Sequence, residues 1–333
     1  MQSGSRPIPF KKTGSAGAER DVRAPDAPAS GELLRIRPLN QSVLDEIGRR
    51  RDEQHILNAM TIDVEDYFHV LAFNGVIDRA LWDALPRRVE QNTNRLLEIF
   101  ADTRTKATFF TLGWVAERHP GLIRRIASEG HELASHGYAH IRADRQNRNE
   151  FRDDVRKAKL LLEDTTGTLV RGYRAPTFSI AKDNWWAFQI LSEEGYTYSS
   201  SVFPIRHDLY GTPNLPRTAF VAEPSRVLEL PLATVRLLSF NFPCAGGGYF
   251  RLLPYGISRW AIRRVNSRGG VPCVFYLHPW EIDPGQPRQY NAPLKSRFRH
   301  YTNLHRTEDR LRRVLRDFSW GRIDQAFSNE LAR

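Results

Sequence analysis

The feature that most constrains the fold is an alternation of short β-rich runs with segments of helical period, which begins near residue 55. Seven β-rich runs are expected, at residues 57–64, 106–112, 132–136, 169–174, 196–201, 227–232 and 272–278. Helices are expected between and after them, at residues 88–102, 120–129, 150–165, 183–194, 254–267 and 307–318. Such alternation predicts an α/β fold with a mostly parallel sheet, and about seven parallel strands predict a closed or nearly closed barrel.

Composition and spacing divide the chain into three parts. With 333 residues, of which 41% are hydrophobic, the chain can bury a full core. Residues 1–50 lack periodic apolar spacing and are broken by prolines, so they are predicted to be a disordered, basic N-terminal extension. The barrel is predicted to occupy residues 51–285, and residues 286–333 are predicted to be a short helical C-terminal extension packed on it.

The net charge of +11 allows affinity for nucleic acid, an anionic membrane surface or an acidic glycan. No zinc-finger spacing or RNP-like aromatic motif accompanies the scattered arginines, so a nucleic acid partner is not expected. The sequence has no signal-peptide h-region and no run of 18 apolar residues, so no membrane span is expected and the predicted location is cytoplasmic. Cys244 and Cys273 are too few for a disulfide framework and are interpreted as core residues.

His136 and His140 lie four residues apart, close enough for both imidazoles to reach one metal ion. Because the chain has only 10 histidines, a second histidine at this spacing is uncommon by chance. The alternative is that one of the two is a core histidine and the other a surface histidine. Two neutral imidazoles and one carboxylate, with an open position for water, match a catalytic zinc site. Other divalent metals bind the same set of ligands, so Zn²⁺ is a preference among them.

Asp63, His136, Arg174 and His278 each lie at the C-terminal end of a different expected strand, where barrel enzymes assemble their active sites. Each residue also has a purely structural alternative. Asp63 could belong to a solvated acidic turn, Arg174 could pair with an acid at the surface, and His278 could be a core histidine. Pro176 fixes the chain direction after Arg174, which favours a rigid arginine that orients a carboxylate. Because histidine titrates near neutrality, His278 suits a proton donor to a leaving amine. Together these residues indicate a metal hydrolase.

The same residues lie within a series of short segments that together form a recognisable pattern. In chain order these are Thr61–Phe68, Ala107–Phe110, Gly130–His136, Gly172–Pro176 and Tyr276–Trp280. Arg299–Tyr301 and Asn303–Leu304 continue this pattern in the tail. Across roughly residues 58–318, the chain therefore resembles the polysaccharide deacetylases with a NodB homology domain. The resemblance is strongest to the subfamily found in exosortase-linked exopolysaccharide loci.

The resemblance implies a deformed (β/α) barrel and metal-dependent hydrolysis of N-acetyl groups on the amino sugars of a polysaccharide. Asp63 would be the general base, held by Arg174, and His278 would be the general acid that protonates the departing amine. His136 and His140 would be ligands of a divalent metal. That metal would lower the pKa of its water and polarise the acetyl oxygen.

The resemblance also implies a substrate class and partners. The substrate would be an N-acetylated polysaccharide or oligosaccharide, in particular an exopolysaccharide or its precursor. Tyr173, Pro176 and Trp280 would contact it. Association with the machinery of exopolysaccharide biosynthesis is a further expectation.

The chain departs from the family pattern in two places. The usual first motif has two adjacent aspartates, whereas Val64 occupies the second place here and the next acids are Glu65 and Asp66. Glu65 is the preferred third metal ligand, and Asp66 is the alternative. The Asp-Trp pair that normally supports the acid histidine is not in register, since Asp183 and Trp185 do not match it.

Two other functions remain open at this point. An amidase that acts on a small cyclic amide, like an allantoinase, shares the barrel and some motifs, and a narrow closed pocket would favour it over a long glycan groove. A noncatalytic glycan-binding barrel is the second alternative. Retention of Asp63, Arg174 and His278 beside both histidines argues against it, because binding alone needs no acid and base.

Overall fold

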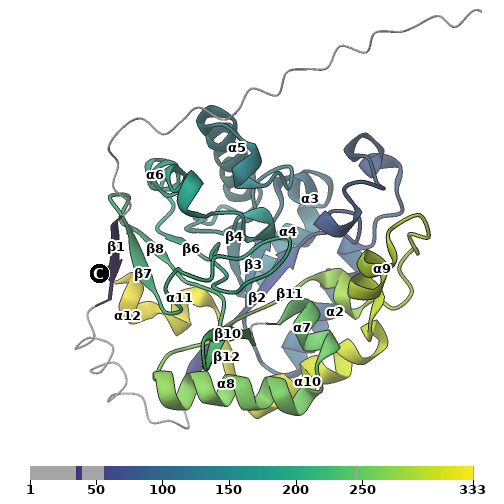
Figure 1. The fold of residues 1–333 in the computed structure, drawn as a ribbon. Coiled ribbons are helices and arrows are strands. Elements are labelled where there is room, and N and C mark those ends of the chain that lie inside the picture. Colours follow the sequence, from purple (N-terminus) through teal and green to yellow (C-terminus); the bar gives the residue numbers. More distant parts are fainter. Residues whose placement is uncertain (1–34, 40–55, 245, 333) are drawn as a thin grey trace, which may run out of the picture.

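The computed structural model describes residues 35–39, 56–244 and 246–332 of the chain. In this part of the chain, seven strands run parallel in the spatial order β8-β6-β5-β4-β3-β2-β11 (Figure 1). Their bounds are β2 (Leu57–Val64), β3 (Thr108–Thr111), β4 (Glu132–Ser135), β5 (Gly172–Tyr173), β6 (Tyr198–Ser199), β8 (Val227–Glu229) and β11 (Val274–Leu277). Each lies within one of the seven β-rich runs, so the expected α/β fold with a mostly parallel sheet is confirmed.

Irregular backbone connects the two ends of this parallel series. After β8, the N–H of Leu230 donates to the Ser199 carbonyl at 2.8 Å, which continues the pairing with β6. Three residues later, the N–H of Ala233 donates to the Val274 carbonyl of β11 at 3.3 Å. One segment thus contacts both ends of the series without forming a regular strand pair, which makes the barrel a deformed one.

Further strands extend the sheet beyond the parallel series. β12 (Ser319–Gly321) pairs in parallel with the first residues of β2, so the C-terminal segment contributes a strand as well as helices. β7 (Phe220–Glu223) pairs antiparallel with β8. A separate hairpin is formed by β9 (Thr234–Leu237) and β10 (Phe240–Pro243).

Part of the segment predicted to be a disordered extension is a strand, which corrects that prediction for these residues. β1 (Arg35–Pro38) pairs antiparallel with β7 at the edge of the sheet. Ile36 packs against the core, and the Arg37 Nε lies 2.9 Å from a carboxylate oxygen of Glu223. Apart from Leu39, which also packs against the core, the remainder of residues 1–50 lies outside the described residues.

Helices surround the sheet (Figure 1). Their bounds are α2 (Val89–Asp102), α3 (Gly113–Arg118), α4 (Pro120–Ser128), α5 (Arg148–Thr166), α6 (Trp186–Glu193), α7 (Gly247–Leu252), α8 (Tyr255–Gly269), α9 (Leu294–Tyr301), α10 (Thr307–Asp317), α11 (Ile323–Ala326) and α12 (Ser328–Leu331). The predicted helices correspond to α2, α4, α5, α6, α8 and α10. α5 shows why such predictions succeed, because Asn147 and Glu150 form a capping box at its start and Gly167 ends it with a φ of 67°.

Short 3-10 helices connect several of these elements. They are η2 (Leu71–Phe73), η3 (Arg79–Ala84), η4 (Ala143–Arg145), η5 (Pro176–Phe178), η6 (Lys182–Asn184), η7 (Pro279–Ile282) and η8 (Leu304–Arg306). Both cysteines are free and buried, as expected for core residues. No described helix is long and apolar enough to cross a membrane.

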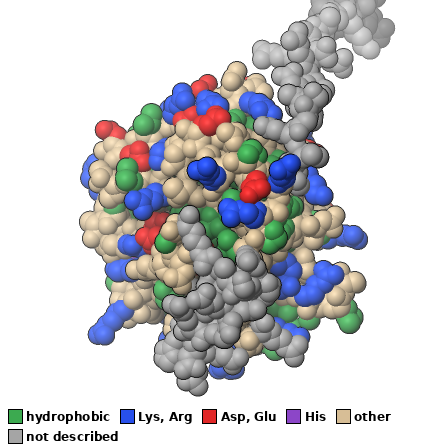
Figure 2. Space-filling model, turned by 90° about the vertical axis from the view of Figure 1, so that its left-hand side faces the viewer, with side chains coloured by type: hydrophobic (Ala, Val, Ile, Leu, Met, Phe, Trp, Pro, Cys, Tyr) green, Lys and Arg blue, Asp and Glu red, His purple; other side chains and the backbone are tan. Residues whose placement is uncertain are grey.

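The surface agrees with the scattered arrangement of basic residues in the sequence. Figure 2 shows the described part of the face around β1 and α12, where Lys and Arg side chains are spread among neutral and acidic ones. On this face the basic side chains do not gather into one continuous stripe of the kind that tracks a nucleic acid backbone.

Candidate active site

The carboxyl ends of the parallel strands surround a cavity of about 330 Å³. Strand register explains why these ends meet, since Asp63 lies beside Phe110 of β3 and Ser135 lies beside Tyr173 of β5. The cavity is lined by residues that the sequence singled out, namely Asp63, Glu65, His136, His140, His278 and Trp280. The sequence therefore predicted the end of the barrel at which polar side chains converge.

Glu65, His136 and His140 form a group that could hold a metal ion. One potential ligand atom from each lies within 4.8 Å of the others, and all three side chains are buried. The Nδ1 of His136 is 2.8 Å from the Arg174 carbonyl oxygen, so Nδ1 carries the proton and Nε2 is free to bind a metal. Burial lowers the pKa of His136 to about 4, which keeps the imidazole neutral as a metal ligand must be.

The carboxylate of Glu65 lies against histidines on two sides. Its Oε2 is 2.7 Å from the His140 Nε2, and its Oε1 is 3.3 Å from the His278 Nε2. Burial by itself would raise the pKa of Glu65, but the imidazoles of His140, His278 and His136 outweigh burial and lower it. The side chain is therefore a carboxylate, the form that binds a cation.

Asp66, the alternative ligand, has a different set of partners. Its carboxylate accepts hydrogen bonds from the backbone N–H groups of Tyr67 at 2.9 Å, Arg88 at 2.6 Å and Val89 at 2.9 Å. These bonds cap the start of α2. Burial raises the pKa of Asp66 to about 6, even though the three N–H groups lower it. The structure thus brings Glu65, and not Asp66, to the two histidines.

The loop that carries His136 and His140 is held in an unusual backbone conformation. Gly137 has a φ of 73° and His140 a φ of 52°, both in the left-handed region. The carboxylate of Asp154 in α5 accepts the N–H groups of Tyr138 at 3.0 Å and Ala139 at 3.2 Å. A Cβ at position 137 would lie 2.5 Å from the Asp154 Oδ2, so this bond requires glycine there.

Arg174 is fully buried and holds Asp63, as the sequence predicted for a rigid arginine. Its Nη1 donates to the Asp63 Oδ1 at 2.6 Å and to the Thr61 Oγ1 at 2.8 Å. Its Nε and Nη2 donate to the carbonyl and the hydroxyl of Ser200 at 3.0 and 2.9 Å. With these partners the buried guanidinium is satisfied and the direction of the Asp63 carboxylate is fixed.

His278 lies opposite the two histidines, with its ring between carboxylates. Its Nε2 is 3.3 Å from the Glu65 Oε1 and 3.9 Å from the Asp63 Oδ2, and its Nδ1 is 2.7 Å from the Glu281 Oε1. Burial would lower the pKa of His278, but these carboxylates outweigh burial and raise it to about 9. The imidazole is thereby suited to carry a proton that it can donate.

Sequence reasoning missed Glu281 and Arg251. Glu281 is fully buried, and its Oε2 accepts a hydrogen bond from the Arg251 Nε at 2.6 Å. The one available signal was the acid three residues after His278. Arg251 had no such signal, because it lies 30 residues before Glu281 in the chain.

Of the three residues expected to contact substrate, only Trp280 lines the cavity. Tyr173 alternates with Arg174 along the chain, so its ring points away from the cavity and packs against Phe151 of α5, with ring centroids 5.8 Å apart. Pro176 is buried in η5 and is not among the described residues that line the cavity. The direction in which the chain leaves β5 thus places both residues outside the cavity wall, and their contact with substrate stays a prediction.

Aromatic and apolar side chains form much of the cavity wall. Tyr210, Tyr249 and Tyr276 line it, together with Thr177 and Phe178. The last two have φ values of 58° and 51°, and strained backbone of this kind is concentrated at functional sites. Three partly exposed apolar side chains also line it, namely Leu209, Leu252 and Phe298.

A buried histidine that was not predicted as a site residue lies behind the cavity. His69 is fully buried, and its Nδ1 accepts the N–H of Asp66 at 2.8 Å. Its ring packs edge-on against Trp82 and Trp114 and lies 6.1 Å from the ring of His140. Burial keeps its pKa well below the ordinary value, so His69 is a neutral part of the wall.

Comparison with known proteins agrees with this arrangement. The sequence model of the polysaccharide deacetylases matches residues 80–199, and that of a domain of unknown function (DUF3473) matches residues 200–328. A peptidoglycan-N-acetylglucosamine deacetylase of Bacillus cereus is 33% identical over 96 residues, which is 28% of this chain and 35% of that protein. Matches to a peptidoglycan deacetylase and a chitooligosaccharide deacetylase cover 36% and 22% of those proteins.

Two solved structures share the fold over nearly the whole chain. One, assigned as a polysaccharide deacetylase from Mycobacterium smegmatis, is 21% identical, covers 93% of both chains and has a TM-score of 0.54. The other, Puue allantoinase, is 15% identical and covers 86% of this chain and 93% of its own, also with a TM-score of 0.54.

The change from one matched family to the other falls at residues 199 and 200, at the end of β6. β8 and β11 follow this point and belong to the same sheet as β2 to β6. The predicted boundary between residues 285 and 286 stays a prediction. Residues 80–199 thus match the polysaccharide deacetylases, and the fold and the convergent strand ends agree with that match.

Proposed function

We propose that this protein is a metal-dependent hydrolase that removes N-acetyl groups from the amino sugars of a polysaccharide, an exopolysaccharide or its precursor. The observation that carries the proposal is the convergence in one cavity of a buried His-His-Glu group, a carboxylate fixed by a buried arginine, and a histidine opposite them. Binding of a glycan would not need this set, because it contains both a base and an acid.

Glu65, His136 and His140 would hold the metal, and the His₂-carboxylate donor set fits Zn²⁺. When bound, such an ion polarises the acetyl oxygen and lowers the pKa of a water molecule. Because Nδ1 of His136 is engaged by the Arg174 carbonyl, its ligand atom would be Nε2. Asp66 would take no part beyond its cap on α2.

The remaining residues would move the protons. Arg174 occupies the Asp63 Oδ1, so Oδ2 would accept the proton of the attacking water. The Nε2 of His278, 3.9 Å from that oxygen, would donate a proton to the amine as the carbon–nitrogen bond breaks. Water and the N-acetyl group would thus give acetate and a free amine.

The cavity wall supports a sugar substrate. Trp280 and the tyrosines of the wall offer flat apolar faces beside polar groups, a combination that suits pyranose rings and acetyl methyl groups. The choice of an exopolysaccharide rests on the resemblance of the sequence to the exosortase-linked subfamily. Work with the biosynthesis machinery of that polymer belongs to the same proposal.

The test is acetate release from N-acetylglucosamine oligomers, measured with and without a chelator. We expect release that stops with chelator and returns when Zn²⁺ is added. Release that H136A leaves unchanged would contradict the metal mechanism. Turnover of a small cyclic amide without release from any glycan would favour the amidase, and binding of glycan without any turnover would favour the noncatalytic barrel.

A further inference from the structure

His278 has a carboxylate partner, although the family's Asp-Trp pair is out of register in this chain. Glu281 reaches it from the next turn of the chain, through η7. The Glu281 Oε1 lies 2.7 Å from the His278 Nδ1 and also accepts the backbone N–H of His278 at 3.1 Å. One oxygen atom therefore fixes both the ring and the main chain of the same residue.

This contact also determines which ring nitrogen faces the cavity. A carboxylate only accepts, so Nδ1 must carry a proton to bond Glu281. Nε2 is then the nitrogen directed at the site, where it lies 3.3 Å from the Glu65 Oε1 and 3.9 Å from the Asp63 Oδ2. When both nitrogens carry protons, the one on Nδ1 is held by Glu281 and the one on Nε2 is available to an amine.

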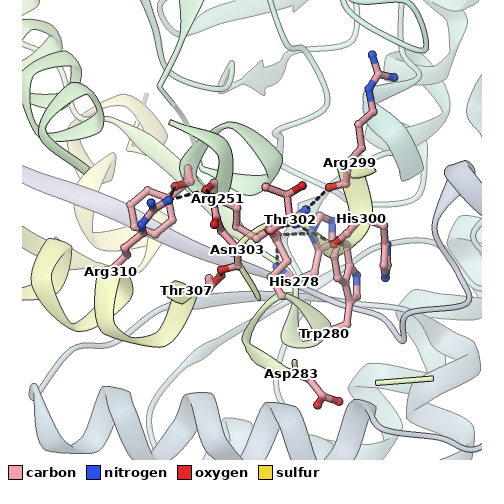
Figure 3. A network of polar contacts seen from close by, with 12 residues as sticks. Arg251, His278, Trp280, Asp283, Arg299, His300, Thr302, Asn303, Thr307 and Arg310 are labelled. Atoms are coloured by element: carbon pink, nitrogen blue, oxygen red, sulfur yellow. Dashed lines mark hydrogen bonds and ion pairs between the residues drawn. The ribbon is translucent and has the colours of Figure 1, made fainter. Parts of the chain in front are cut away.

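Arg251 holds Glu281 in turn. Its Nε donates to the Glu281 Oε2 at 2.6 Å, and its side chain is only 3% exposed. Its other N–H groups donate to backbone carbonyls at the end of α9 and just beyond it, those of Arg299 at 3.0 Å, His300 at 2.9 Å and Thr302 at 2.9 Å. Figure 3 shows Arg251 among these residues, so one guanidinium joins α7, η7 and α9 behind His278.

The face of the His278 ring is supported as well. The Trp280 ring lies nearly parallel to it at 5.1 Å, and the His300 ring lies nearly parallel to Trp280 at 4.2 Å. The His300 Nε2 is 2.6 Å from the Gln286 Oε1, and Gln286 donates to the Trp280 carbonyl at 2.8 Å. His278, Trp280 and His300 are thus a stacked column whose far end is fixed by a hydrogen bond.

We infer that Glu281 and Arg251 are positioning residues that hold His278 in the orientation and tautomer needed to protonate the leaving amine. The inference rests on the proposed function, since it assigns a task within that reaction. Both residues, with His278 and α9, lie in the region 200–328, which matches a domain of unknown function. Its task in this chain would be to supply and orient the acid of the active site.

A purely structural role is the competing explanation, because Arg251 also ties α9 to the barrel. The two roles differ in which substrates they affect. An amide needs its amine protonated as it leaves, whereas 4-nitrophenyl acetate releases a phenolate that needs no proton. Loss of a positioned acid should therefore slow the amide selectively, and loss of structure should slow both.

The experiment compares the metal-loaded wild type, E281Q and H278A on N-acetylglucosamine oligomers and on 4-nitrophenyl acetate. We expect E281Q to lower kcat on the oligomer by about 100-fold with KM within about 2-fold, and to change the ester rate by less than about 3-fold. H278A should show the same selectivity. A loss in E281Q that is equal on both substrates, or that appears in KM alone, overturns the inference.

D283N is the matched control. Asp283 ends the same turn and pairs with Arg88 at 2.7 Å, but the structure gives it no contact with His278. D283N should leave the ratio of the oligomer rate to the ester rate unchanged, whatever its effect on stability. A D283N variant with the selectivity of E281Q would mean that any disturbance of this turn gives the effect, which contradicts a specific role for Glu281.

A second measurement separates this inference from the proposed function. Long-range ¹H–¹⁵N spectra of the wild type should show His278 with a proton on Nδ1, and E281A should change that signal. If no glycan releases acetate but the His278 signal changes in E281A as expected, the proposed function fails, whereas the role of Glu281 in setting the tautomer of His278 stands. Identical His278 spectra in wild type and E281A overturn the positioning role by themselves.

Discussion

The two sides of the cavity are built in different ways. Asp63, Glu65, His136 and Arg174 lie at the carboxyl ends of β2, β4 and β5, three strands of the same parallel series. His278 instead depends on partners spread over the last third of the chain. The side with Asp63, Glu65 and His136, called here the metal side after its proposed role, depends on strand register. The side with His278, called the acid side, depends on packing between elements far apart in the chain.

This difference indicates how each side can vary. Register fixes the metal side, because a strand that shifts by one residue would turn His136 or Asp63 away from the cavity. The acid side needs only that some carboxylate reach the His278 Nδ1. Under the proposed function, Glu281 would serve in this chain as that carboxylate, with Arg251 stabilising its buried charge.

The largest expected effect lies on the metal side. H136A removes a ligand from the His-His-Glu group, so we expect loss of tight metal binding and a fall in kcat/KM on the order of 10³-fold. Isothermal titration with Zn²⁺ and the acetate assay measure the two effects. H131Q is the control, since His131 is also a buried histidine but precedes β4 at the opposite end of the barrel. Metal binding that survives in H136A would contradict the asymmetry of the two sides.

The next effect lies on the acid side and should leave the metal side intact. R251M leaves the Glu281 carboxylate buried without its cation, so the free energy of unfolding should fall by about 3 kcal/mol. Hydrogen exchange should quicken at the end of α9, because two of its carbonyls and that of Thr302 just beyond it lose their donor. Urea unfolding and exchange measure these changes. If R251M weakens Zn²⁺ binding as much as H136A does, the two sides are not independent.

The same contrast explains what the sequence could predict. All seven parallel strands fall in predicted β-rich runs, most of them separated by helical segments, and Asp63, His136 and His278 follow or end such runs. The preference for Glu65 over Asp66 follows from the resemblance to proteins with an acid-x-acid motif, and the structure adds that Asp66 is engaged at the start of α2. In each case the information lies within a few residues of chain.

The parts that the sequence did not predict depend on contacts over long distances. Arg251 pairs with Glu281, and His300 stacks on Trp280. Neither contact restricts the residue types next to its partners in the sequence, so neither produces a periodic pattern that could be recognised there. The direction of the Tyr173 side chain was not predicted for a related reason. Its motif predicts closeness to Arg174, but only the strand determines that the two side chains point in opposite directions.

A smaller effect concerns the pH dependence of stability and arises from Glu229 in β8. Burial raises the pKa of Glu229 in β8 from 4.5 to about 7, against hydrogen bonds from the N–H groups of Ser201 and Val202. The unfolded chain therefore loses this proton near pH 4.5 and the folded protein near pH 7, so stability falls as pH rises through that window, by at most about 3 kcal/mol. E229Q should flatten this fall in urea unfolding between pH 4.5 and 7.5. Parallel pH curves for wild type and E229Q would contradict the assignment.

The smallest effect on the free energy of unfolding should come from a surface contact between α2 and α10. Glu308 of α10 accepts two hydrogen bonds from Arg95 of α2, at 2.6 and 3.1 Å, but both side chains are partly exposed. Water already solvates such a pair, so E308Q should lower the free energy of unfolding by less than about 1 kcal/mol and leave acetate release unchanged. Urea unfolding of E308Q beside R251M measures the contrast directly. A loss in E308Q as large as that in R251M would mean that number of contacts, and not burial of charge, decides how firmly the acid side is attached to the barrel.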